Sequence, residues 1–421
     1  MDHERRIGSF LVDGKNLALP NGTGVASYAR SLCDNLRTTS NRVELLYGEK
    51  LSTVARQNLP SAIHYPLRYT KRIVSALRTT VPQRYHIEQA SDSRLPSHQP
   101  AVDGYWNAPD VFDPPLDLVK AGWMQRVRNV MAVDAAHWTY PVPTRLEDAY
   151  NIYTLHDLVP LMMPEMTLDN KRAYFSMIKK ITETADLIIT VSEQSKIDIH
   201  TIFNIPDTRV INTYQDVNIP AEYLTKDDEQ VSTELREAYG LECGQFILFY
   251  GAIEPKKNVG RLVEAFLSSR IQIPLIIAGK DGWLVKHELR AYMDHIENAL
   301  NPPRIRRIPY VPRHNLFNLI RGARAVAFPS LYEGFGLPIA EAMLCGTPLL
   351  TSNCGAMREI AGSAAILVDP YSTESIRLGL EKLTYDSVLR EEMGRAGRER
   401  SAMFNSDKYR SRLNSAYSSL C

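Results

Sequence analysis

Short apolar segments alternate with helix-forming segments through both halves of the chain. In the first half the predicted strands are Ile7–Val12, Val43–Tyr47, Asn151–Leu155 and Leu187–Val191, with a predicted helix at Val25–Arg37. In the second half the predicted strands are Phe246–Tyr250, Pro274–Ala278, Ala325–Phe328, Leu349–Thr351 and Ile366–Val368, and the predicted helices are Asn258–Phe266, Trp283–Leu300 and Pro338–Leu344. This alternation predicts parallel sheets covered by helices. We therefore expect an α/β fold of two doubly wound, Rossmann-like domains that face each other across a cleft, with ligands at the carboxyl ends of the strands.

The length of the chain sets the number of domains. A chain of 421 residues is too long for one compact core and suits two domains of about 200 residues each. The polar, acidic stretch Leu224–Glu234 indicates exposed surface near a linker. We expect an N-terminal domain at residues 1–217 and a C-terminal domain at residues 218–402.

Composition excludes several classes of protein. A hydrophobic content of 44% and a charged content of 23% exclude disordered and fibrous chains, and a net charge of +1 excludes a globally basic nucleic-acid binder. The five cysteines lack metal-ligand spacing, which indicates reduced thiols in the cytoplasm. The N-terminus does not fit a signal peptide, and no apolar run approaches the roughly 18–20 residues of a membrane span. We therefore expect a cytoplasmic protein whose membrane contact, if it has one, is peripheral.

One segment suggests where such a contact would lie. Within Arg68–Arg78 the apolar residues fall close to helical spacing and the basic residues line the other side. The segment fits a surface helix packed on the first sheet. A docking face for an anionic membrane or a lipid-linked acceptor is the second alternative.

Glu333 and Glu341 flank a glycine-rich turn at the start of a predicted helix. Gly334 and Gly336 have no Cβ, so the backbone there allows a ligand to approach closely. The helix start offers free N–H groups and a positive dipole end, which stabilise a diphosphate. Two carboxylates eight positions apart reach different parts of one extended ligand. By themselves, Glu341 would also fit a first-turn acid that complements the dipole, and Glu333 a surface charge.

The run Tyr332–Pro348 resembles glycosyltransferase family 4. Asn353–Glu359 and Ala364–Pro370 are similar to the downstream loop and last strand of that family, so the resemblance covers the second half of the chain. It implies the GT-B fold, sugar transfer with retention, and an E-x7-E motif. It also implies that a helix at Ser406–Ser419, within a C-terminal segment at residues 403–421, crosses back to the first domain.

The resemblance further implies how a nucleotide-sugar would bind. Glu341 would bind the ribose hydroxyls, Glu333 would act as a catalytic residue holding sugar hydroxyls near the reacting end, and the base would lie near Val311. Further sugar oxygens would be held by the backbone amides of Phe335, Gly336 and Leu337.

A lysine pair lies between a predicted strand and a predicted helix, in the run Gly251–Asn258. Lys256 and Lys257 would place two ammonium groups on a diphosphate as it leaves, and Lys257 is the one we expect to act in catalysis. Family members frequently have arginine plus lysine in this region, and here Ala252 replaces a common arginine. A lysine pair alone would also fit a solvated surface. Because the chain has no Asp-x-Asp at a strand end, we expect neither a metal nor another cofactor.

In the first half, a predicted strand ends in His156 and Asp157. These are similar to the strand-end His-Asp of the family, which implies a catalytic His156 facing the transferred sugar with Asp157 beside it, although a lone strand-end histidine is often structural. The loop Pro20–Val25 resembles the N-terminal glycine-rich loop of the family, and Gly24 would help it close over the diphosphate and acceptor. A plain turn would have the same composition.

The runs around His156 and Lys257 resemble those of bacterial mannosyltransferases of polysaccharide and O-antigen assembly. That resemblance favours a GDP-sugar as donor, with GDP-mannose as the first choice. It favours a glycan or lipid-linked glycan as acceptor, and it implies no nucleic-acid partner. Two alternatives stay open: a nucleotide-sugar epimerase on the same fold, and a non-catalytic sugar-binding or scaffold subunit.

Overall fold

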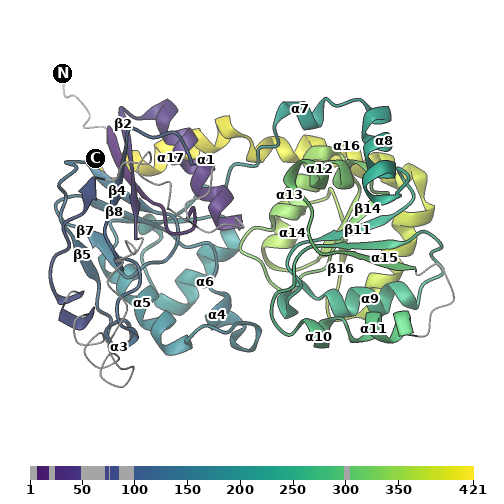
Figure 1. Cartoon of the computed structure of the whole chain (residues 1–421), viewed down its shortest axis with the longest axis horizontal. Coiled ribbons are helices and arrows are strands. Elements are labelled where there is room, and N and C mark those ends of the chain that lie inside the picture. The colour runs from purple at the N-terminus through teal and green to yellow at the C-terminus, as the bar shows by residue number, and fades with distance from the viewer. Residues whose placement is uncertain (1–6, 19–23, 49–71, 75, 85–98, 298–303) are drawn as a thin grey trace, which may run out of the picture. The chain divides into compact units, whose positions relative to one another are not determined.

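The structure is a computed structural model that describes residues 7–18, 24–48, 72–74, 76–84, 99–297 and 304–421. The chain divides into two compact units (Figure 1). The first comprises Met1–Asp216 and Ser406–Cys421, and the second comprises Val217–Asn405.

The first unit is built on an eight-stranded sheet in the order β10-β9-β8-β6-β1-β2-β4-β3. All neighbouring strands are parallel except β3 and β4. The strands are β1 (Ser9–Asp13), β2 (Arg42–Tyr47), β3 (Gln83–Arg84), β4 (Gly104–Asn107), β6 (Ala135–Trp138), β8 (Tyr150–Thr154), β9 (Leu187–Thr190) and β10 (Val210–Asn212). A separate parallel pair is formed by β5 (Gln125–Val127) and β7 (Thr144–Leu146). The helices of this unit are α1 (Gly24–Thr39), α3 (Leu116–Lys120), α4 (Val159–Met162), α5 (Lys171–Thr184), α6 (Glu193–Phe203) and α17 (Ser406–Ser418).

The second unit is built on a six-stranded, fully parallel sheet in the order β13-β12-β11-β14-β15-β16. Its strands are β11 (Ile247–Tyr250), β12 (Leu275–Ala278), β13 (Ile305–Ile308), β14 (Ala325–Phe328), β15 (Leu349–Ser352) and β16 (Ile366–Val368). Its helices are α7 (Ala221–Leu224), α8 (Asp228–Tyr239), α9 (Val259–Leu267), α10 (Val285–Glu288), α11 (Arg290–Glu297), α12 (Arg313–Gly322), α13 (Leu337–Cys345), α14 (Gly355–Ala361), α15 (Thr373–Tyr385) and α16 (Ser387–Ser401).

Both sheets have the architecture of a Rossmann fold. Counted within the second unit, the strand order is 3-2-1-4-5-6, the order of a doubly wound dinucleotide-binding sheet. Central strands such as β11 and β14 are buried along their whole length, because helices cover both faces of a parallel sheet. The predicted α/β fold with two Rossmann-like domains is therefore confirmed.

In two segments the observed secondary structure differs from the prediction. The single helix expected at Trp283–Leu300 is instead two helices, α10 and α11, and residues 298–300 lie outside the described part. Leu284 has φ 54°, which is incompatible with a right-handed helix, so the helix begins only at Val285. The stretch Leu224–Glu234 is mostly exposed, as expected, but much of it belongs to α8, because Val231 and Leu235 are buried four positions apart on one helix face.

The basic segment Arg68–Arg78 is only partly described. Residues 68–71 and 75 lie outside the described residues. Val74 and Leu77 are 46% and 44% exposed, while Ala76 is buried. Val74 and Leu77 therefore face solvent, which does not fit the alternative of a helix that packs its apolar residues on the sheet.

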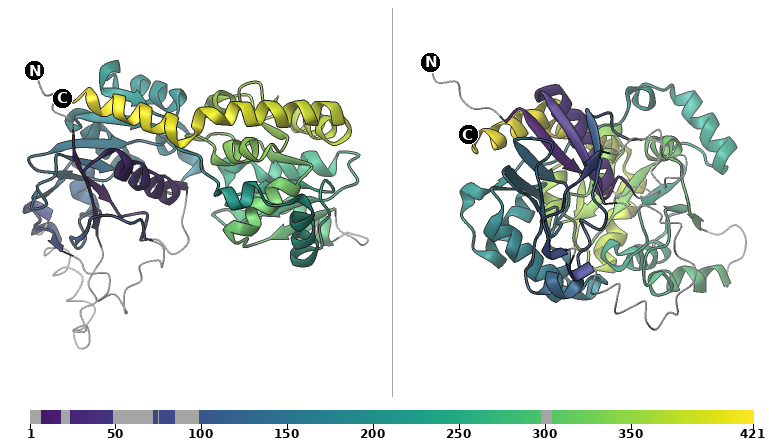
Figure 2. Two further views of the ribbon diagram at one scale, coloured as in Figure 1. Left: turned by 90° about the horizontal axis from the view of Figure 1, so that it is seen from above. Right: turned by 60° about the vertical axis from the view of Figure 1, so that its left-hand side comes forward.

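The C-terminal helix α17 packs in the first unit, beside α1 (Figure 1, Figure 2). His137 links it to the sheet: His137 Nδ1 lies 2.7 Å from the hydroxyl of Tyr417, and Nε2 lies 2.7 Å from Thr154 Oγ1. The Thr154 hydroxyl also lies 2.9 Å from the hydroxyl of Tyr28 on α1. Burial lowers the pKa of His137 to about 3, so this histidine is neutral and its two ring nitrogens join α17 to β8.

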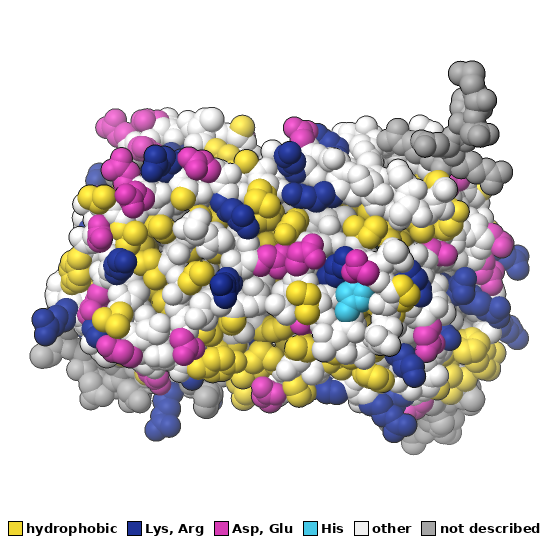
Figure 3. All heavy atoms as spheres, turned by 180° about the vertical axis from the view of Figure 1, so that it is seen from behind, with side chains coloured by type: hydrophobic (Ala, Val, Ile, Leu, Met, Phe, Trp, Pro, Cys, Tyr) yellow, Lys and Arg dark blue, Asp and Glu magenta, His cyan; other side chains and the backbone are white. Residues whose placement is uncertain are grey.

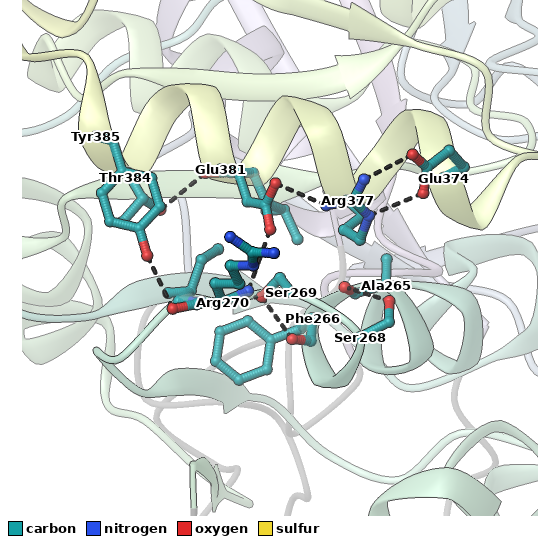
Figure 4. A network of polar contacts seen from close by, with 12 residues as sticks. Ala265, Phe266, Ser268, Ser269, Arg270, Glu374, Arg377, Glu381, Thr384 and Tyr385 are labelled. Carbon is teal, nitrogen blue, oxygen red and sulfur yellow. Dashed lines mark hydrogen bonds and ion pairs between the residues drawn. The ribbon is translucent and has the colours of Figure 1, made fainter.

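In the second unit, polar contacts tie α15 to the end of α9 (Figure 4). Arg377 pairs with Glu374 and Glu381, and Glu381 accepts the backbone N–H of Arg270 at 3.1 Å. The hydroxyl of Tyr385 donates to the carbonyl of Arg270 at 2.8 Å. The network anchors the segment that follows α9 to α15, and the lysine pair lies just before the other end of α9.

The surface shows no basic face in the view of Figure 3, where Lys and Arg side chains are interspersed with Asp and Glu. Within the described ranges, none of the helices combines the length and the apolar character needed to cross a bilayer.

Candidate functional site

The second sheet has a topological switch point between β11 and β14. From these neighbouring strands the chain proceeds in opposite directions, to β12 on one side and to β15 on the other. In doubly wound sheets, ligands bind at the carboxyl ends of the strands at such a point. Lys256 and Lys257 follow β11 and Glu333 follows β14, so the fold brings these three predicted site residues together.

Lys257 and Glu333 form a direct ion pair. Lys257 Nζ lies 2.5 Å from Glu333 Oε1, and Lys256 Nζ lies 3.9 Å from Glu333 Oε2. The side chains of Lys257 and Glu333 are only 14% and 9% exposed. Burial acts to raise the pKa of Glu333, but the charges of Lys257 and Lys256 outweigh burial and hold that pKa below its ordinary value. Glu333 is therefore an ionised, mostly buried carboxylate, not the surface charge that its sequence position also allowed.

Lys257 is fixed from a second side by an aromatic ring. Its Nζ lies 5.0 Å from the ring centre of Phe328, the last residue of β14, which is a cation–π distance. Lys256 pairs in addition with Glu254 Oε1 at 3.7 Å. The two ammonium groups thus have defined positions on one short 3-10 turn, Pro255–Lys257.

Asn258 connects three strand-end loops. Its Nδ2 donates to the carbonyls of Pro329 and Pro370, at 3.0 and 2.7 Å, and Arg261 donates to its Oδ1 at 2.7 Å. These prolines follow β14 and β16, whereas Asn258 itself follows β11. Its φ of 60° is left-handed, a conformation that asparagine adopts more readily than most residues. The sequence reasoning gave Asn258 no role, although an asparagine at a turn directly before a helix is a recognisable signal.

The glycine-rich turn after Glu333 leads into α13. Gly336 has φ 88°, a backbone conformation that residues with a Cβ rarely adopt, so the turn favours glycine. Leu337 is the first helical residue, and Phe335 is buried against Phe404 with ring centres 5.3 Å apart. The first turn of a helix offers backbone N–H groups without partners inside the helix. Phe335, Gly336 and Leu337 therefore lie where an anion or a sugar oxygen would meet such groups.

Glu341 lies further along α13 and is held by Tyr250. The phenolic oxygen of Tyr250 lies 3.0 Å from Glu341 Oε2 and 3.0 Å from the carbonyl oxygen of Pro338. Burial raises the pKa of Glu341, the opposite direction from Glu333. Two carboxyl groups with opposite pKa shifts are suited to different tasks. Tyr250 was missed by sequence reasoning, since the last residue of an apolar strand suggests only core packing.

Val311 lies apart from these groups. It is partly exposed and follows β13, two strands away from β11 in the sheet, beside Tyr310, which is 72% exposed. In the described part of the chain, neither a hydrogen bond nor an ion pair joins Val311 to the lysines or glutamates.

The remaining predicted site residues belong to the first unit. His156 follows β8 and its Nε2 lies 2.8 Å from the carbonyl oxygen of Thr139. A carbonyl only accepts, so Nε2 carries the proton and Nδ1 is the unprotonated nitrogen. Burial lowers the pKa of His156, which keeps the ring neutral, and the ring of Tyr28 packs edge-on against it at 4.7 Å.

Asp157 and Gly24 each mark the start of a helix. Asp157 Oδ1 accepts the backbone N–H of Val159 at 3.2 Å, at the beginning of α4, so part of its role is local. Gly24 is the first residue of α1. Residues 19–23 of the predicted loop Pro20–Val25 lie outside the described residues.

Asp13 supports His156 indirectly and was also missed. It ends β1, is fully buried and accepts the backbone N–H of Thr139, whose carbonyl in turn accepts His156 Nε2. β1 and β6 are the strands at the switch point of the first sheet, and Thr139 directly follows β6. The only feature of the sequence that could have indicated this role of Asp13 is an acidic residue at the end of an apolar strand.

The described residues contain no group of three or more His, Cys, Asp or Glu side chains arranged to hold a metal ion.

The chain is similar to several known proteins. Residues 231–400 match the family Glycosyl transferases group 1. The O-antigen chain mannosyltransferase B of Escherichia coli is 32% identical over 255 residues, which cover 59% of this chain and 65% of that protein. The serotype-specific mannosyltransferase WbdA of Escherichia coli is 27% identical over 275 residues, 64% of this chain. The chain thus spans just under two thirds of the first relative and 33% of the second.

Among solved structures, Anabaena Alr3699/HepE in complex with UDP and glucose superposes with a TM-score of 0.66 at 13% identity, covering 96% of this chain and 98% of that one. At that identity the likeness shows the fold. The second unit therefore contains a glycosyltransferase group 1 domain, and the chain as a whole has the GT-B fold of glycosyltransferases.

Proposed function

We propose that the chain is a retaining, metal-independent glycosyltransferase that transfers a sugar from a nucleotide-sugar to a glycan or lipid-linked glycan in the assembly of cell-surface polysaccharide. The donor we favour is GDP-mannose. Support comes from the group 1 domain and from relatives named as O-antigen mannosyltransferases. A nucleotide-sugar donor is further supported by the UDP-glucose complex of HepE, which has the same fold.

The observation that carries this proposal is the Lys256–Lys257–Glu333 cluster at the switch point of a sheet that has the strand order of dinucleotide-binding domains. When the bond between sugar and diphosphate breaks, negative charge builds on the departing diphosphate. Two fixed ammonium groups in a mostly buried site stabilise that charge, which is the role a metal ion has in other transferases. Glu333, kept ionised by the same lysines, would accept hydrogen bonds from sugar hydroxyls near the reacting carbon.

The rest of the donor would lie along the second unit. Glu341 would bind the ribose hydroxyls and the base would lie near Val311. The backbone N–H groups around Gly336, at the start of α13, would hold sugar and phosphate oxygens.

The first unit would supply the acceptor side. Neutral His156, with an unprotonated Nδ1, would accept a hydrogen bond from a substrate hydroxyl, with Asp157 beside it, and Gly24, at the start of α1, would also contact the substrate. The acceptor oxygen would form a bond to the anomeric carbon on the face from which the diphosphate leaves. The bond to the diphosphate breaks in the same step, and a phosphate oxygen takes the proton of the acceptor.

We further propose a cytoplasmic protein with a peripheral contact to an anionic membrane through Arg68–Arg78. The exposed Val74 and Leu77 support such a contact, because a solvent-facing apolar pair beside basic residues suits a bilayer interface.

A thermal-shift screen of nucleotide-sugars tests the donor assignment, since a ligand that binds only the native state raises the melting temperature. We expect GDP-mannose to raise it more than UDP-glucose does. Conversion of the donor to another sugar isomer without an acceptor would instead indicate an epimerase.

A further inference from the structure

Tyr250 contributes a buried hydroxyl between two acceptors at the end of β11. The side chain is 5% exposed, and its oxygen lies 3.0 Å from both Pro338 O and Glu341 Oε2. Pro338 and Glu341 are on the first turns of α13, so the hydroxyl joins the strand to the helix that carries the second glutamate.

A phenol has a single proton, whereas Tyr250 faces two acceptors. If Glu341 is ionised, the phenol donates to its carboxylate. If Glu341 is neutral, the carboxyl donates its own proton to the phenol oxygen, and the phenol donates to Pro338. The three oxygens therefore have two well-bonded arrangements that differ by one proton, and both keep Glu341 Oε2 against Tyr250.

Among the residues that the structure describes, none forms an ion pair with Glu341. Burial raises its pKa, and the charge of Arg313, at the start of α12, acts in the opposite direction. Burial and the neighbouring Glu341 raise the pKa of the Cys345 thiol, one turn further along α13, to about 12, so that group is neutral. In the described part of the chain, Tyr250 is the residue that donates a hydrogen bond to the Glu341 carboxylate.

We propose that Tyr250 is a positioning residue: its hydroxyl orients the Glu341 carboxyl so that its free oxygen meets the two ribose hydroxyls of a nucleoside diphosphate. This inference rests on the proposed function, because it takes Glu341 as the ribose contact. A vicinal diol offers two donors, and a carboxylate fixed at one oxygen presents a defined edge to them. Without the phenol, the carboxyl would rotate and reach the diol less often.

The test compares Tyr250→Phe with wild type, using GDP, UDP and their 2′,3′-dideoxy analogues in calorimetric titrations. Tyr292→Phe is the matched control, since Tyr292 is a buried tyrosine of the same unit whose hydroxyl has no hydrogen bond to any described residue. Loss of a hydrogen bond to a charged group predicts about tenfold weaker binding of the better-bound ribonucleotide to Tyr250→Phe. The dideoxy analogue should bind to wild type and Tyr250→Phe alike, because it has no diol to recognise.

A second comparison keeps the proposal testable if Tyr250→Phe folds poorly. In a Glu341→Gln background, adding Tyr250→Phe should change ribonucleotide binding by less than twofold, since both changes act through the same contact. Equal weakening of ribonucleotide and dideoxynucleotide, or unchanged ribonucleotide binding in Tyr250→Phe, would overturn the positioning role and leave the proposed function standing. Failure of wild type to bind any of the nucleotides would overturn both.

Discussion

The ammonium group of Lys257 lies 2.5 Å from a carboxylate oxygen of Glu333, although 76 positions separate the two residues in the chain. Each side chain compensates the charge of the other in a place where water has little access. Replacing Lys257 alone leaves Glu333 only the longer contact with Lys256, and replacing Glu333 alone leaves the mostly buried Lys257 without this carboxylate. Single and double replacements therefore separate the contribution of the pair to stability from its contribution to activity.

Lys257→Met is expected to lower both the free energy of unfolding and the rate of sugar transfer. Removing one partner of a buried pair costs about 3 kcal/mol of unfolding free energy, and losing a charge that stabilises the departing diphosphate costs at least about 100-fold in kcat. Adding Glu333→Gln should restore most of the stability and none of the activity. Urea unfolding and transfer assays on the single and double variants measure this, and a double variant that regains transfer would contradict the roles assigned to the pair.

The two glutamates are expected to respond to pH in opposite directions. The pKa of Glu333 is lowered on folding, so its contribution to stability is present above the ordinary glutamate pKa and is lost as pH falls through the folded value. The pKa of Glu341 is raised, so ionising it costs stability as pH rises through its folded value. Relative to wild type, Glu333→Gln should therefore be less stable at pH 7 and nearly equal at low pH.

The matching comparison uses Glu341→Gln, which should gain stability relative to wild type as pH rises from 4 to 8. Unfolding free energies of the three proteins across that range provide the measurement. If the unfolding free energies of Glu333→Gln and Glu341→Gln changed with pH in parallel, one of the two pKa shifts would be absent.

His137→Phe is expected to destabilise the first unit by about 2 kcal/mol at pH 7, because it removes the hydrogen bond to the Tyr417 hydroxyl and one of the two hydrogen bonds of the Thr154 hydroxyl. The pKa of His137 falls to about 3 on folding, so wild type loses stability as pH falls from about 6.5 towards that value, while the variant does not. The difference in stability between wild type and His137→Phe should therefore become smaller at acidic pH. Thermal unfolding at pH 7 and pH 5 tests this, and a gap that widens at pH 5 would refute a neutral His137.

Asn258→Ala and Asn258→Gly separate two contributions at one position. Glycine accepts the left-handed backbone and removes the side-chain hydrogen bonds with Pro329, Pro370 and Arg261, whereas alanine removes the same bonds and also strains the backbone. We expect glycine to cost about 2 kcal/mol and alanine about 1 kcal/mol more. Both variants should raise KM for the donor. If the alanine variant proved as stable as the glycine variant, the left-handed backbone at position 258 would not be strained by a Cβ.

The sequence predicted the fold class because the signal is local. Runs such as Ala325–Phe328 and Phe246–Tyr250 are apolar at every position, which is typical of strands covered on both faces. The glycine-rich turn and the helix start beyond Glu333 were also predictable from residue type alone. Helix boundaries were less so: the left-handed Leu284 that separates Trp283 from α10 has no signature in its side chain.

The supporting residues of the site could not be found in this way. Asp13, Tyr250 and Asn258 act through residues that are distant in sequence, and their roles depend on which strands become neighbours. The burial that shifts the pKa values of Glu333 and Glu341 apart is likewise a property of the folded chain. Residue type and spacing predicted which residues would contact a ligand. The structure was needed to identify the residues that hold those side chains in position.

The most direct measurement is the anomeric configuration of the product. The full chain is incubated with GDP-mannose carrying ¹³C at the anomeric carbon, an octyl mannoside acceptor and EDTA, alongside Glu333→Gln. We expect wild type to release GDP and form an α-linked disaccharide in equal amounts, and Glu333→Gln to do neither at a measurable rate. A β-linked product, a requirement for added metal, or equal rates for wild type and Glu333→Gln would contradict a retaining, metal-independent transferase built on the Lys257–Glu333 pair.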